Sequence, residues 1–189
     1  MNELTFHGPY TLASVDTDVL GDCPYKDEPG IYLWCVPTDK FGFVVDYVGE
    51  TNQSFYKRTK EHMIRTIGGD YEICDPKALT RAEYSIIWRG LWRKGTRDKL
   101  PEFLSRVHEL APLIREFIQL HRLFLAPTDL DDRKRKRLEG AIATTIRSST
   151  PCLLSPDVRY IQRNKSERPI KYGLRSARPI YSLPVEVAA

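Results

Sequence analysis

The chain has no long apolar run, no paired cysteines and no strong excess of charge of one sign. None of its segments approaches the ~20 apolar residues that a membrane-spanning helix needs. Its first residues carry acidic side chains and no apolar run, so we expect no signal peptide and no membrane partner. The four cysteines form no CxxC pair, which argues against a zinc site or a disulfide framework. We therefore expect reduced thiols and a cytoplasmic protein.

What the chain does contain is typical of a globular protein. Its 189 residues are 41% hydrophobic and 29% charged, which suits one domain with a sizeable core. The formal net charge of +4 is compatible with nucleic-acid binding but does not establish it. The sequence has no internal repeat and no low-complexity segment, so its function must be sought in individual residues.

Two β-prone runs surround a short turn in the first third of the chain. They are GIYLWCV at 30–36 and FVVDYV at 43–48, and the intervening PTDKFG has turn chemistry, so we predict a β-hairpin. A helix is predicted next over 54–66, with Ser54 as its N-cap residue. A third strand is predicted over 82–88.

The second half of the chain is predicted to be mainly helical. Residues 101–125 have helical periodicity, and Pro112 should break or kink that helix. Another helix should begin near residues 128–129, where acidic residues favour the N-terminal turn. Its apolar stripe recurs at i, i+4 and i+8, at Leu138, Ile142 and Ile146. We expect the tail from 159 onward to wrap the domain in extended form.

The hairpin carries a tyrosine on each strand, in the triplets GIY at 30–32 and YVG at 47–49. If Val36 pairs with Phe43, Tyr32 lies directly opposite Tyr47, and directly opposed residues share one face of an antiparallel pair. A slip of one residue would place the two phenols on opposite faces. The alternative is that both tyrosines simply pack, as aromatic residues on strands usually do.

The predicted helix after the hairpin carries Arg58 and His62, which are four residues apart and therefore share a face. The planar guanidinium of arginine matches a phosphate group with two parallel charged hydrogen bonds. A histidine can shuttle a proton or hold a phosphate oxygen. The alternative is an ordinary solvated face, which is the better interpretation for the neighbouring Lys57, Lys60 and Glu61.

The order of these residues along the chain resembles the GIY-YIG nuclease superfamily. The shared set is Tyr32, Tyr47, Arg58, His62, Glu139 and Asn164. The segment YVGETNQSFYKRTKEH looks especially close to that family, and the resemblance covers 30–62 and resumes near Glu139. Some repair-type members carry a lysine directly after the second triplet, where this chain has Glu50, so that role must be absent or be filled by Lys57.

The resemblance implies an α/β (α+β) fold with a small antiparallel sheet flanked by helices. It divides the chain into a lead-in over 1–29, a nuclease-like core over 30–69 and 129–189, and a largely helical insertion over 70–128. The insertion carries none of the family's residues. It could recognise DNA or pair two subunits into a homodimer.

The resemblance also implies a divalent-metal-dependent endonuclease that hydrolyses DNA phosphodiester bonds. Tyr32 would be the general base, with Arg58 and the metal ion favouring its phenolate, and Tyr47 and His62 would position the water and the phosphate. Glu139 would hold Mg²⁺ or Mn²⁺, and one glutamate can suffice because magnesium keeps several waters. Asn164 would orient Glu139 or the water. The alternatives are an ordinary surface glutamate and a plain loop asparagine.

Basic residues gather in three segments, at 89–99, at 133–137 and along the tail from 157 to 178. Such stretches suit a surface that follows a nucleic-acid backbone, although a solvated polar tail has the same composition. The residues we predict to contact DNA are Lys57, Arg93, Lys94, Arg133, Arg135, Arg163 and Lys165.

Two other functions remain open from the sequence. One is a non-catalytic nucleic-acid-binding module on a decayed GIY-YIG fold, although the full set of family residues argues against decay. The other is a structural or interaction protein whose insertion binds a protein partner. Metal-dependent cleavage that Glu139 controls would separate the nuclease from both.

Overall fold

The β-prone runs of the sequence meet in one mixed sheet. The computed structural model describes residues 2–12, 18–91 and 97–189, and there the sheet has seven strands in the order β8-β3-β2-β6-β1-β7-β9. The strands are β1 (Asn2–Thr11), β2 (Gly30–Thr38), β3 (Gly42–Thr51), β6 (Arg122–Pro127), β7 (Lys171–Ser176), β8 (Ile180–Tyr181) and β9 (Glu186–Ala188). Neighbours β3, β2, β6 and β1 are antiparallel, whereas β1 pairs with β7, and β3 with β8, in parallel. The mixed α/β architecture is confirmed, but the sheet is larger than the small antiparallel one expected.

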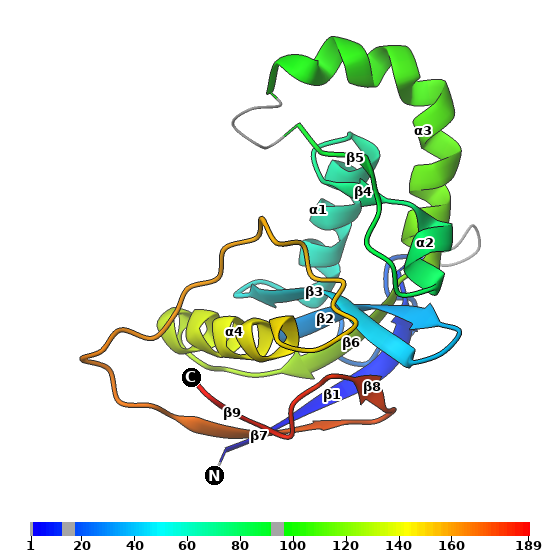
Figure 1. Ribbon diagram of the computed structural model, residues 1–189. Coiled ribbons are helices and arrows are strands. Elements are labelled where there is room, and N and C mark those ends of the chain that lie inside the picture. Colours follow the sequence, from blue (N-terminus) through cyan, green and yellow to red (C-terminus); the bar gives the residue numbers. More distant parts are fainter. Residues whose placement is uncertain (1, 13–17, 92–96) are drawn as a thin grey trace.

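Helices cover both faces of this sheet, and the sheet separates the hydrophobic core into two clusters (Figure 1). The helix α4 (Asp132–Arg147) packs through its apolar stripe against one face. The other face is covered by α1 (Phe55–Ile67) and α3 (Leu100–Leu120), together with α2 (Pro76–Thr80), the 3-10 turn η1 (Arg97–Lys99) and a small sheet of β4 (Ile73–Cys74) and β5 (Ile86–Trp88). None of the helices in the described ranges is both long and apolar enough to cross a bilayer.

The hairpin and the helices around it form as their local sequence predicts. The hydroxyl of Ser54 accepts a hydrogen bond from the backbone N–H of Lys57 at 3.2 Å, which makes Ser54 the N-cap residue of α1. The helix α4 begins later than expected. Its N-cap residue is Asp131, whose carboxylate accepts the N–H of Lys134 at 2.9 Å.

The prediction of helix over 121–125 is wrong, because these residues open the central strand β6. His121 already has an extended backbone, and the apolar run that follows is completely buried between β1 and β2. A short, wholly buried apolar run has no periodicity that separates strand from helix. Segment 70–128 thus ends in the sheet itself. The division into core and insertion stays a prediction.

Two further predictions differ in detail from the structure. The strand expected over 82–88 is shorter, spans only Ile86–Trp88 and pairs with β4 outside the main sheet. Pro112 lies inside α3, which continues through it but is visibly bent (Figure 1). A bend agrees with the missing N–H and the ring clash of an interior proline.

Candidate active site

A β-bulge places the two tyrosines of the hairpin on the same face. Val36 pairs with Val44, not with Phe43, and Tyr47 lies opposite Trp34, so the predicted direct pairing of Tyr32 with Tyr47 is wrong. The register shifts by one residue between Trp34 and Cys35, where Asp46 is the extra residue of β3. If the register on the turn side continued without this bulge, Tyr47 would pair with Leu33 and point to the opposite face from Tyr32. With it, the two phenol rings lie 6.1 Å apart between centroids.

The residue directly opposite Tyr32 is Gly49, and the Tyr32 ring lies against it. A Cβ atom built on Gly49 would lie 2.2 Å from Cζ of Tyr32, closer than real atoms approach. Only glycine therefore leaves room for the ring to cross β3 at this point. This packing gives a physical reason for the glycine of the YVG triplet.

The Tyr32 hydroxyl lies between a base and a cation. Its oxygen is 2.9 Å from Nε2 of His62, and it accepts a hydrogen bond from Nε of Arg58 at 3.2 Å. Burial, followed by the charges of Arg58 and Arg65, lowers the pKa of His62 to about 3, so His62 is neutral at pH 7. Arg58 can only donate, so the phenolic proton is directed to His62 Nε2 in the tautomer in which that nitrogen carries no hydrogen.

Burial controls the protonation of both tyrosines. Burial and the neighbouring Tyr47 raise the pKa of Tyr32 well above its ordinary value, and the opposing effect of Arg58 is smaller. Burial and the charge of Glu139 raise the pKa of Tyr47 to about 12. Arg58 does favour a phenolate at Tyr32, as expected, but burial has the larger effect on the pKa. Tyr32 is therefore a neutral phenol at pH 7.

Arg58 is oriented by neighbours on its own helix and in the loop before it. Its Nη1 lies 3.3 Å from Oε2 of Glu61, and the amide of Gln53 donates to both carboxylate oxygens of Glu61 at 3.1 Å. Arg58 therefore reaches Tyr32 with one nitrogen and Glu61 with another. Its side chain remains 27% exposed, which leaves guanidinium N–H groups able to meet a ligand.

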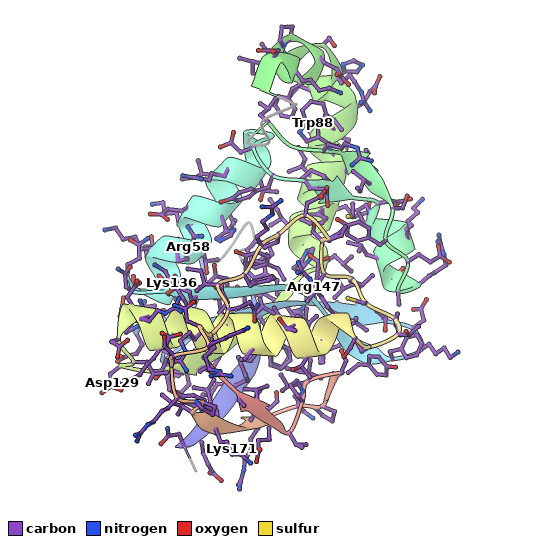
Figure 2. All side chains as sticks on the ribbon, turned by 60° about the vertical axis from the view of Figure 1, so that its left-hand side comes forward. Arg58, Trp88, Asp129, Lys136, Arg147 and Lys171 are labelled. Carbon is purple, nitrogen blue, oxygen red and sulfur yellow. The ribbon has the colours of Figure 1, made fainter. Side chains whose placement is uncertain are left out.

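Glu139 lies half-buried on α4, close to β3. Burial, followed by the charge of Glu50, raises the pKa of Glu139 to about 8, while the backbone N–H of Glu50 donates to it and acts in the opposite direction. Arg58 and Lys136, labelled on α1 and α4 in Figure 2, also act electrostatically on this carboxyl. Within the described ranges, however, no cationic side chain forms an ion pair with Glu139.

Tyr160 and Tyr71 are members of this cluster that the sequence reasoning missed. Tyr160 accepts the backbone N–H of Val48, lies in the field of Tyr47 and Glu139, and stacks under the guanidinium of Arg147 at 5.0 Å. The Tyr71 ring lies 5.2 Å from that of His62. The interleaving of Tyr160 with basic residues in the tail was the only signal for it, and nothing in the sequence indicated Tyr71.

The tail crosses α4 at Gly140, the residue after Glu139. A Cβ atom on Gly140 would lie 2.1 Å from the carbonyl oxygen of Ile161, so the close crossing requires glycine there. Arg147 holds the preceding part of the tail by donating to the carbonyls of Ser155 and Val158.

Asn164, the sixth family residue, lies on the exposed part of this tail. Its backbone N–H donates to Oε2 of Glu167 at 2.6 Å, and its carbonyl accepts from Arg163 at 3.5 Å. These contacts fold the tail locally and do not connect Asn164 with the tyrosines. Its role in orienting Glu139 or a water stays a prediction.

The basic residues proposed for DNA contact fall into two groups. Arg135 is buried and bonds Glu50 at 2.6 Å, and Arg133 bonds Glu167 through two nitrogens at 2.8 Å each, so both have partners within the chain. The exposed ones are Lys57, Arg163 and Lys165. Arg93 and Lys94 lie outside the described residues. Contact with DNA stays a prediction for all of them.

A cavity of about 330 Å³ adjoins the cluster and shares two residues with it, Tyr47 and His62. It lies among β3, α1, α3, the segment 71–74 and the start of the tail. Its walls are largely aromatic and come from Trp34, Tyr47, His62, Tyr71, Tyr84 and Phe117.

Side chains alone do not build a complete metal cage in the described part of the chain, where no group of three or more His, Cys, Asp or Glu converges. A cation here would depend on Glu139 and water. Comparison of the chain with protein-family models, with curated proteins and with solved structures gave no match. The geometry of the cluster is therefore the feature that indicates a function.

Proposed function

We propose that this protein is a divalent-metal-dependent endonuclease of the GIY-YIG type that hydrolyses DNA phosphodiester bonds. The observation that carries the proposal is the Tyr32 hydroxyl, bonded to both a neutral His62 and Arg58 at 2.9 and 3.2 Å. Phenol, imidazole, guanidinium and the nearby Glu139 carboxyl are the groups that proton removal, phosphate binding and metal binding need.

The hydrogen-bond chain suggests how a buried phenol acts as a base at neutral pH. Tyr32 accepts the proton of an attacking water while its own proton passes to Nε2 of His62. A concerted transfer of this kind needs no free phenolate, which burial disfavours. His62 is neutral and already faces the hydroxyl, and although the burial that lowers its pKa to about 3 also disfavours the imidazolium formed here, the negative charge of a bound phosphate would offset that effect. Arg58 donates to a phosphate oxygen with the N–H groups not used by Tyr32 and Glu61.

Glu139 fits a divalent cation because it is a half-buried carboxyl without an ion-pair partner in the described ranges. A bound Mg²⁺ or Mn²⁺ would supply the missing positive charge, stabilise charge on the phosphate and assist the leaving oxygen. Glu50 lies close enough to act on Glu139, but its carboxylate is held by Arg135. Glu139 is therefore the side chain that would hold the ion.

The test is incubation of supercoiled plasmid with the purified protein and Mg²⁺ or Mn²⁺. We expect cleavage by the wild type, loss of cleavage in Glu139→Gln, and cleavage at the wild-type rate in Glu116→Gln, which makes the same change on the exposed surface of α3. Mn²⁺ should raise the melting temperature of the wild type but not of Glu139→Gln. Efficient cleavage by Glu139→Gln would overturn this mechanism. Salt-sensitive DNA binding without any cleavage would favour the non-catalytic binding module.

A further inference from the structure

The cavity beside the active-site cluster has the dimensions of a site for one small planar group. Its volume of about 330 Å³ is at the lower end of the ~300–1,000 Å³ that ligand pockets occupy. Tyr47 and His62 line both the cavity and the cluster, and Nε2 of His62 is 2.9 Å from the Tyr32 hydroxyl, which Arg58 also bonds. A ligand in the cavity would therefore contact the same cluster as a phosphate bound at Arg58.

The walls of the cavity suit a flat aromatic ligand. The rings of His62 and Tyr71 lie 5.2 Å apart with only 35° between their planes, and Trp34 packs against His62 at 5.5 Å. Nucleobases stack on aromatic side chains, and one such contact contributes about 1–3 kcal/mol. The proposed nuclease function needs no aromatic cavity of this kind, since the reaction takes place on the phosphate.

The polar groups of the cavity include both acceptors and donors. Asp46 and Glu72 contribute carboxylates to the lining, and Arg65 contributes a guanidinium. Asp46 Oδ2 is 3.0 Å from Nε2 of His121, and Glu72 Oε1 accepts the hydroxyl of Tyr84. A carboxylate has about four lone-pair sites, so both can accept further N–H groups. Such carboxylates repel a phosphate but accept bonds from the exocyclic amino group of a base.

Two polar groups of lining residues also lack a partner. The indole N–H of Trp34 and the hydroxyl of Ser155 are buried and form no hydrogen bond within the described part of the chain. A buried donor without a partner is costly, and an acceptor on the edge or carbonyl of a base would satisfy it. Acceptors for amino groups, a donor for a ring nitrogen or carbonyl, and aromatic faces together match a nucleobase.

We propose that this cavity receives a single nucleobase with an exocyclic amino group, from the nucleotide adjoining the phosphate at Arg58. The proposal rests on the proposed nuclease function for its substrate. Thymine fits less well, because two carbonyls flank its single N–H and would face Asp46 and Glu72. The base can come from an unpaired strand or be extruded from a duplex, since both sources present the same chemistry.

The test measures binding without divalent metal, so that cleavage plays no part. The probes are fluorescently labelled eight-nucleotide strands of deoxycytidine, deoxyadenosine or thymidine, which carry the same number of phosphates. We expect the wild type to bind the amino-bearing strands at least about fivefold more tightly than the thymidine strand, the lower limit for one good base contact. Val158→Phe fills the cavity and should abolish this preference. The matched control Val185→Phe makes the same change at a side chain that is 84% exposed.

Tyr71→Leu is the second cavity variant and removes only the stacking surface, so it covers the case in which Val158→Phe does not fold. Equal binding of all three strands by the wild type, or a preference retained in both cavity variants, overturns the proposal. Plasmid cleavage without base preference would support the nuclease function and contradict the nucleobase pocket. Absence of both cleavage and binding would contradict both proposals. If a duplex with one mismatch binds more tightly than a perfect duplex, the base that enters the cavity is extruded from a duplex. If the two duplexes bind equally, the base comes from an unpaired strand.

Discussion

The hydroxyl of Tyr32 lies 2.9 Å from Nε2 of His62, and burial keeps both groups uncharged. A proton passed from Tyr32 to His62 alone would leave a phenolate and an imidazolium in the protein interior, so the transfer must be concerted with proton uptake by Tyr32 from water. Strand β2 holds Tyr32 and helix α1 holds His62. The same helix carries Arg58 one turn earlier.

We predict that Tyr32→Phe slows plasmid cleavage by about 10²–10⁴-fold, the usual contribution of a positioned acid or base. The substitution removes only the hydroxyl, so the ring should still pack on Gly49. Metal binding should persist, and the increase in melting temperature caused by Mn²⁺ should match that of the wild type. A rate within threefold or so of the wild type would show that Tyr32 is not the base.

The second prediction concerns stability and pH. The folded pKa of His62 is lowered to about 3 from an ordinary 6.5, so between these values the unfolded chain binds a proton that the folded protein does not. Stability should therefore fall as the pH decreases from 6.5 toward 3, by up to about 1.4 kcal/mol per pH unit from this residue. Urea unfolding across this range should show a shallower slope for His62→Gln than for the wild type. Parallel slopes would mean that His62 titrates normally.

The third prediction tests the contact between Tyr32 and Gly49. Gly49→Ala places a methyl group where the ring lies and should destabilise the protein by about 1–3 kcal/mol. A double-mutant cycle isolates this clash. The same Gly49→Ala change in a Tyr32→Leu background should have a much smaller effect on the free energy of unfolding. Equal losses in the two backgrounds would place the strain elsewhere in β3.

The sequence predicts that Tyr32 and Tyr47 lie on the same face of the hairpin, but it does not predict the β-bulge that places them there. The predicted register and the observed one differ by a residue at the turn, and the bulge at Asp46 restores the phase before Tyr47. Asp46 is neither glycine nor proline, so no turn signal marks the bulge. Its carboxylate bonds the buried His121, a partner brought there only by the folded chain.

Parts of the site that depend on distant segments were beyond local reasoning. Arg58 and His62 could be placed from their helical spacing, because α1 is a local structure with a visible N-cap. Tyr160 reaches the cluster through an extended tail without periodicity. The strand β6 was read as helix because burial on both sides removes the alternation that identifies a strand.

The last prediction separates a structural arginine from a DNA-binding one. The run at 133–137 looks like a cationic patch, yet Arg135 is buried and bonded to Glu50 at 2.6 Å and to the carbonyl of Leu130 at 2.8 Å. Removing it leaves Glu50 half-buried without its cation and next to Glu139, so Arg135→Ala should destabilise the protein by about 3–5 kcal/mol.

The control for Arg135→Ala is Lys134→Ala, on the exposed side of the same helix, which should change stability little. Urea unfolding measures both variants. DNA affinity should depend on exposed cations and not on Arg135. Lys165→Ala, at an exposed position, should reduce the salt dependence of binding by about one released counterion without changing stability. An Arg135→Ala protein with normal stability and weakened DNA binding would instead make Arg135 a phosphate contact, and the ion pair with Glu50 would then have to open when DNA binds.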